Sequence, residues 1–191
     1  MRSFGFILLF LCCTAAYAQQ KKPQKKIVLK YWEDMSQKER DAMLADSTLS
    51  KDVLALYNNA FVFTDSKATT ALFKALTWDK ENNLPLRFYL FNKLIASGDT
   101  SLNKYLTEYS AKMLLNQTDF AVKYFNRERL KKNSFYKKYI PFLAADLDEK
   151  NEYGTFRDYL NYFFYIEKND SIKQTVAILL KELEAAGAGK K

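Results

Sequence analysis

Four short turns at nearly constant spacing divide most of this sequence into segments of similar length. Each turn pairs Asp or Asn with Ser or Thr, residues that accept hydrogen bonds from the first free N–H groups of a helix. Successive turns are 34, 34 and 37 residues apart. They lie at Asp65-Ser66, Asp99-Thr100, Asn133-Ser134 and Asp170-Ser171. A spacing of this length suits two helices joined by a turn.

Apolar residues stand at matched positions before the four turns. The columns eleven and eight residues before each turn are three residues apart, as on one side of a helix. The first column is Leu54, Phe88, Val122 and Tyr159, and the second is Tyr57, Phe91, Phe125 and Tyr162. Fixed apolar offsets of this kind predict equivalent helices in repeated hairpins.

The stretch 86–113 is the clearest of these hairpins. Phe88, Phe91 and Ile95 recur at helical spacing, and Gly98 stands where a left-handed C-terminal cap is expected. No segment combines alternating apolar residues with hairpin-turn chemistry. We therefore predict an all-α fold without a sheet, built either as a short α-solenoid of stacked hairpins or as an irregular helical bundle.

The 34-residue period has the same length as a tetratricopeptide repeat, but no other feature of that family is shared. The small residues at the helix crossing and the repeat-ending proline of that family are not found in register here. The prediction therefore names an architecture and no family.

The composition divides the chain into four parts. We predict a cleaved secretory signal peptide over 1–18, a flexible basic arm over 19–26, one helical domain over 27–186 and a disordered tail over 187–191. Within the domain, hairpins are expected near 50–77, 84–116, 118–148 and 155–186.

The first 18 residues have the layout of a secretory signal. Arg2 is followed by an apolar run over 4–13, and Ala16-Tyr17-Ala18 is a small-residue cleavage pattern. The run has about half the roughly 20 residues that a membrane-spanning helix needs. We expect cleavage near Ala18, a periplasmic or secreted protein and no transmembrane segment in the mature chain. Lipid attachment at Cys12 or Cys13 is the weaker alternative, because neither cysteine follows a small residue.

The residue types exclude most catalytic chemistry. The chain has no histidine, and its two cysteines would leave with the signal. Histidine-dependent triads, thiolate nucleophiles and His or Cys metal sites are thereby excluded. No phosphate-binding or dinucleotide motif is present, so we predict no cofactor and no enzymatic activity. A carboxylate-based glycoside hydrolase stays a minor alternative, with Glu33 and Asp34 or the acids over 146–149 as candidates.

An asparagine follows a large apolar residue once in each predicted repeat. At about 100° per residue, each amide lies at the edge of its apolar stripe, where it can bond an extended peptide backbone. These candidate partner-binding residues are Asn58, Asn92, Asn126 and Asn161. The alternative is that they bond neighbouring hairpins and are structural.

A basic cluster marks the third predicted hairpin, and the chain without its signal carries a formal charge of +7. Such a cluster can bind anions or complement the C-terminal end of a helix dipole. The candidate residues are Lys123, Arg127, Lys131, Lys132, Lys137 and Lys138. Anionic envelope lipid or glycan is therefore a possible partner, whereas export argues against nucleic acid.

The segment 159–166, YLNYFFYI, is apolar around nearly its whole circumference. Such a helix is usually buried, but Tyr162 or Tyr165 would make binding anchors if they were exposed. The leading expectation is an exported, non-enzymatic helical-repeat protein that binds a protein or peptide partner in the bacterial envelope.

Overall fold

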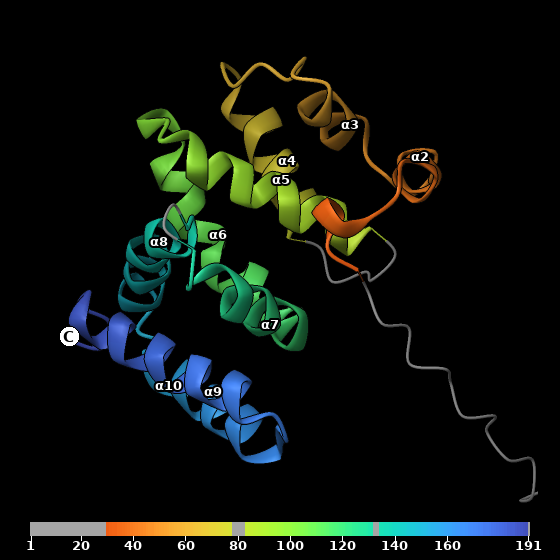
Figure 1. Cartoon of the computed structure of the whole chain (residues 1–191). Helices are drawn as coiled ribbons and strands as arrows, with labels where there is room; N and C mark the ends of the chain where they lie inside the picture. The colour runs from red at the N-terminus through yellow and green to blue at the C-terminus, as the bar shows by residue number, and fades with distance from the viewer. Residues whose placement is uncertain (1–29, 78–82, 132–133, 191) are drawn as a thin grey trace, which may run out of the picture.

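The computed structural model describes residues 30–77, 83–131 and 134–190. Every regular element in these residues is helical, which confirms the predicted all-α class (Figure 1). Two 3₁₀ turns, η1 (Trp32–Asp34) and η2 (Thr100–Leu102), accompany the α-helices. These are α2 (Gln37–Leu44), α3 (Lys51–Tyr57), α4 (Ser66–Leu76), α5 (Leu84–Ser97), α6 (Asn103–Leu115), α7 (Thr118–Glu128), α8 (Tyr136–Glu149), α9 (Tyr153–Ile166) and α10 (Asp170–Ala185).

The predicted signal peptide over 1–18 and the arm over 19–26 lie outside the described residues. Within the described ranges, no helix has both the length and the apolar character needed to cross a bilayer.

Local polar residues start and stop the helices. Ser36 forms a capping box with Glu39, and Asp65 accepts from the backbone N–H groups of the first turn of α4. Gly98 ends α5 in the left-handed conformation, at φ 70°. At the last turn the N-cap of α10 is Asn169 and not the predicted Asp170, because the Asn169 amide oxygen reaches the first free N–H groups. The predicted turn residue Asn133 is outside the described ranges.

The helices stack in two rows through α8. In one row α4 contacts α6 and α6 contacts α8, and in the other α3 contacts α5. The second row continues from α5 to α7 through aromatic contacts, since Phe88 meets Phe120 and Tyr124 at ring-centroid distances of 5.4 and 5.1 Å. This arrangement is a stack of hairpins (Figure 1).

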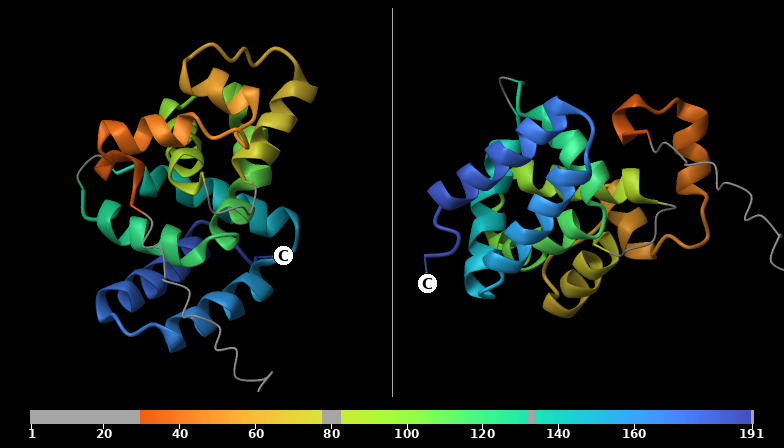
Figure 2. Two further views of the ribbon diagram at one scale, coloured as in Figure 1. Left: turned by 90° about the vertical axis from the view of Figure 1, so that its right-hand side faces the viewer. Right: turned by 90° about the horizontal axis from the view of Figure 1, so that it is seen from below.

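The last hairpin departs from this order. A regular stack would place α9 against α7, but here α10 packs on both α7 and α8. The α10 residues Ile172, Val176, Leu179 and Leu183 are buried in that position. Figures 1 and 2 show the α9–α10 hairpin at one end of the stack. As a consequence, one side of α9 packs on α8 and α10, and the other side is exposed to solvent.

Buried polar groups join α6 to α8 where the two helices approach closely. The Asp146 carboxylate accepts from the Ala111 N–H at 2.8 Å and pairs with the Lys150 ammonium at 2.5 Å. The Tyr139 hydroxyl donates to the Ser110 carbonyl at 2.7 Å. Burial raises the pKa of Asp146, and its hydrogen bonds to Lys150 and Ala111 oppose that shift. Asp146 is therefore a structural residue rather than a solvated helix end.

Residues 187–190 of the predicted disordered tail fold back against the domain in the structure. Ala188 is buried, and its N–H donates to the Leu183 carbonyl at 3.0 Å. Gly187 and Gly189 adopt positive φ angles of 107° and 75°, which let the chain fold back. A Cβ at Gly189 would lie 2.5 Å from the Tyr153 ring, so glycine permits this close approach.

Candidate functional site

The predicted asparagine positions do not share one surface. Asn58 is exposed and caps the C-terminus of α3, and Asn161 is exposed on α9. Asn92 is buried in α5, and its amide atoms have no hydrogen-bond partner among the described residues. Four positions in such different environments cannot line a single peptide-binding groove.

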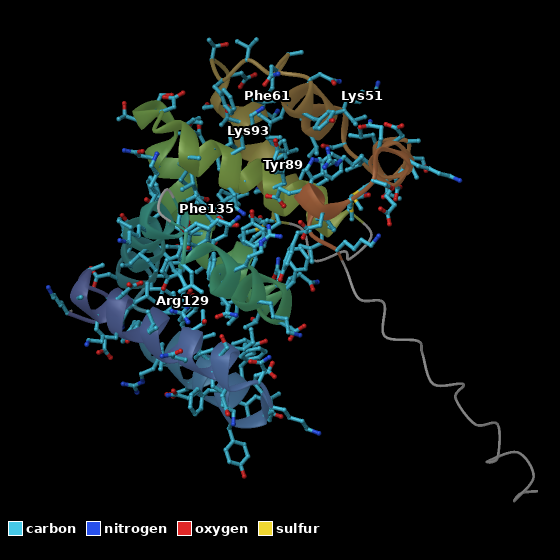
Figure 3. All side chains as sticks on the ribbon, in the orientation of Figure 1. Lys51, Phe61, Tyr89, Lys93, Arg129 and Phe135 are labelled. Atoms are coloured by element: carbon cyan, nitrogen blue, oxygen red, sulfur yellow. The ribbon has the colours of Figure 1, made fainter. Side chains whose placement is uncertain are left out.

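Asn126 makes hydrogen bonds between helices. Its amide oxygen accepts from the Ser171 and Thr175 hydroxyls of α10, at 3.0 and 2.8 Å. The Arg129 guanidinium also donates to the Thr175 hydroxyl at 3.0 Å, and its side chain points toward α10 (Figure 3). These bonds fix the last hairpin against α7, which is the structural alternative raised for the asparagines.

Most of the described basic residues interact with the chain itself. Lys123 pairs with Asp119 at 2.7 Å and Lys131 with Glu128 at 2.5 Å. Lys138 donates to the Ala96 carbonyl, near the C-terminal end of α5, at 2.9 Å. Lys137 is exposed, and Lys132 lies outside the described residues. The cluster therefore presents less free positive charge than the sequence suggests.

Arg127 is the centre of a cluster that binds the N-terminal segment to α7. Its guanidinium carbon lies 4.4 Å from the Tyr31 ring centroid and 4.7 Å from that of Tyr124. The same group pairs with Asp34 at 2.6 Å and with Glu33 at 3.5 Å. Glu33 and Asp34, two of the acids named as hydrolase candidates, are thus partners of this arginine.

The tyrosines of this cluster are poor acids. Burial raises the pKa of Tyr31 to about 12, although the nearby Arg127 guanidinium opposes the shift. Burial, together with the hydrogen bond that Tyr124 donates to Glu33 at 2.5 Å, raises the pKa of Tyr124. Both groups stay neutral in the physiological range and contribute by packing and hydrogen bonding.

The exposed large apolar side chains are concentrated on α9. Of seven such residues in the described part of the chain, five belong to this helix. Tyr159, Tyr162, Tyr165 and Ile166 have exposed fractions of 45, 63, 84 and 52%. Their spacing places them along one side of the helix. We call these four side chains the α9 face, and Asn161 lies beside it.

The opposite side of α9 explains why this face points outward. Tyr153, Phe156 and Leu160 recur at helical spacing and are buried. The Tyr153 hydroxyl also donates to the Glu184 carboxylate of α10 at 2.9 Å. Because this side anchors α9 to α10, the tyrosines over 159–165 cannot turn into the core. The sequence alone could not distinguish the two sides, since 159–166 is apolar all round.

The described residues offer little that suits a small molecule or metal. One cavity of about 70 Å³ lies between α3, α4 and α5, lined in part by Val53, Asn83 and Arg87. It has room for water but not for an organic substrate. No three Asp or Glu side chains in the described ranges cluster as metal ligands. The α9 face is therefore the strongest candidate site.

Comparison with protein-family models, with curated proteins and with solved structures gives no match for this chain. The α9 face is therefore the feature of the molecule from which a function can be inferred.

Proposed function

We propose that this chain is an exported, non-enzymatic helical-repeat protein that binds a protein partner in the bacterial envelope through the α9 face. The observation that carries the proposal is the concentration of exposed large apolar side chains on α9. Isolated exposed apolar residues are ordinary, whereas a contiguous group marks an interaction site.

The residue types of the α9 face suit protein recognition. Tyrosine supplies a large contact area at low cost in side-chain entropy and keeps a polar group at its tip. Tyrosine is also enriched among the residues that dominate binding energy at protein interfaces. Binding to anionic lipid or glycan has less support, because Lys123, Arg127 and Lys131 are already paired with carboxylates. The envelope location is supported by the signal-like residues 1–18.

Replacing Tyr162 with glutamate should abolish most partner capture from an envelope extract by the immobilised protein. A charge at the centre of an apolar contact should weaken binding by at least about 30-fold, the effect of losing an interface hot spot. The melting temperature should change little, because this side chain is 63% exposed. Capture is measured by quantifying bound proteins at several extract concentrations.

Val62→Glu is the matched control, because Val62 is 66% exposed and lies outside α9. It should leave capture unchanged. Equal capture by wild type and Tyr162→Glu, or equal losses in both variants, would contradict the assignment of binding to the α9 face.

A further inference from the structure

We propose that the partner which the α9 face fits is the α9 face of a second copy of this chain, in an antiparallel, two-fold symmetric pair. The inference rests on the proposed function, because the same face carries both. It is supported by the order of side chains along α9, by the charges at its two ends and by the area available for contact.

The order of side chains is self-complementary in the antiparallel direction. With the two-fold axis at Tyr162, this ring meets its own copy and Tyr159 lies opposite Tyr165 of the other molecule. Aromatic pairs of this kind are worth more than their buried area alone. A two-fold pair also closes on itself, so the association stops at a dimer.

The charges that flank the α9 face also favour antiparallel pairing. Asp158, with its side chain 73% exposed, lies at the N-terminal end of the face. Lys168 is exposed just beyond the C-terminal end. Antiparallel pairing brings Asp158 near Lys168 of the second copy at both ends of the contact. Parallel pairing would instead bring each charge near its own copy, which is repulsive.

The other charges near the α9 face, Glu167 and Arg157, make contacts within their own chain. Glu167 accepts from the backbone N–H groups of Lys168 and Asn169 at 2.7 and 2.9 Å. Arg157 lies 3.4 Å from the Asp158 carboxylate of its own helix and is half exposed. Because the Arg157 and Asp158 side chains are 49 and 73% exposed, their contact is weak, and Asp158 can still pair with Lys168 of the second copy.

The contact area predicts a weak but specific dimer. At about 200 Å² for a tyrosine, the exposed fractions correspond to about 500 Å² per copy. A symmetric pair would thus bury on the order of 1,000 Å², the lower end for specific protein interfaces. We expect a dissociation constant of about 10 μM, with tighter association at low salt because of the flanking charges.

Sedimentation equilibrium of the purified protein tests the proposal between about 1 and 200 μM, a range that brackets such an interface. Wild type should shift from monomer to dimer across this range, and no larger species should form. Tyr162→Glu brings two carboxylates together at the axis and should weaken the dimer by at least about 100-fold. A wild-type protein that stays monomeric throughout would overturn the proposal.

A charge exchange tests the direction of pairing. Asp158→Lys alone should weaken the dimer about tenfold at low salt, because it places cations opposite each other. Lys168→Asp alone should do the same with anions. The double variant Asp158→Lys/Lys168→Asp should return to within about threefold of wild type, since the attraction is restored with opposite sign. Failure of the double variant to recover would overturn the antiparallel arrangement.

The two proposals fail in distinguishable ways. If wild type is monomeric but Tyr162→Glu loses capture of a different envelope protein, the self-pairing is wrong and the proposed binding face stands. If wild type forms the dimer but the monomeric Tyr162→Glu variant captures envelope proteins as well as wild type does, the self-pairing stands. In that case the α9 face is not the site for other partners.

Discussion

Replacing Phe125 with alanine is expected to lower the free energy of unfolding by about 3–5 kcal/mol, the range for a fully buried phenylalanine. The Phe125 side chain has no solvent exposure. Its ring lies within 5.2 Å of the Tyr136 centroid and 5.1 Å of the Tyr139 centroid, and 6.4 Å from Phe88. It thereby contacts α5 and α8 from α7, so its loss opens a cavity between hairpins. The change should lower the melting temperature by about 8–15 °C.

Phe164→Ala supplies the control for this prediction, because Phe164 is an aromatic residue of α9 that is 40% exposed. It should cost about 1–1.5 kcal/mol, since this side chain is only partly buried and its loss leaves no closed cavity. Urea unfolding followed by circular dichroism measures both values. Similar losses in the two variants would mean that α5, α7 and α8 do not share the core described here.

Asp146→Ala is expected to destabilise the protein by about 2–3 kcal/mol, because it removes a buried carboxylate that accepts a hydrogen bond from the main chain of α6. The variant leaves the Ala111 N–H and the Lys150 ammonium without the carboxylate that they contact at 2.8 and 2.5 Å. The first contact joins α8 to α6, and the second holds the Asp146 carboxylate in place at the end of α8. The loss of stability should appear as a lower urea concentration at the unfolding midpoint, with an unchanged dependence of the free energy of unfolding on urea.

Asp146→Asn separates the hydrogen bond from the charge. The amide oxygen can still accept from the Ala111 N–H, so this variant should lose about half as much stability as Asp146→Ala. If the two variants are equally stable, the bond between Asp146 and Ala111 does not contribute to the packing of α6 on α8.

The parts of the fold that depend on neighbouring residues could be predicted from the sequence. Ser36, Asp65 and Gly98 act on backbone groups within a few positions, so their identity is enough to locate a helix end. Asn169 and Asp170 are adjacent and both can cap, so the sequence could not decide between them. In the structure, the Asn169 side chain points toward the first N–H groups of α10 and caps the helix.

Contacts between hairpins could not be predicted in the same way. Asn126 and Asn92 occupy equivalent positions by sequence, yet only Asn126 faces hydroxyl donors of α10. Arg127 belongs to a basic run, but its partners Glu33 and Asp34 come from more than 90 residues away. The orientation of α9 follows from α10 packing against α7, which no local pattern specifies.

Binding through the α9 face is tested most directly by photo-crosslinking in cells, with a photoreactive phenylalanine analogue at position 162 or at position 62 of the full chain. Both positions are exposed, with fractions of 63 and 66%, so the probe should be tolerated at either. We expect a discrete adduct from position 162, either with a second copy of the chain or with another envelope protein, and no matching adduct from position 62. A folded protein that gives no adduct from position 162, or the same adducts from both positions, would contradict binding through the α9 face.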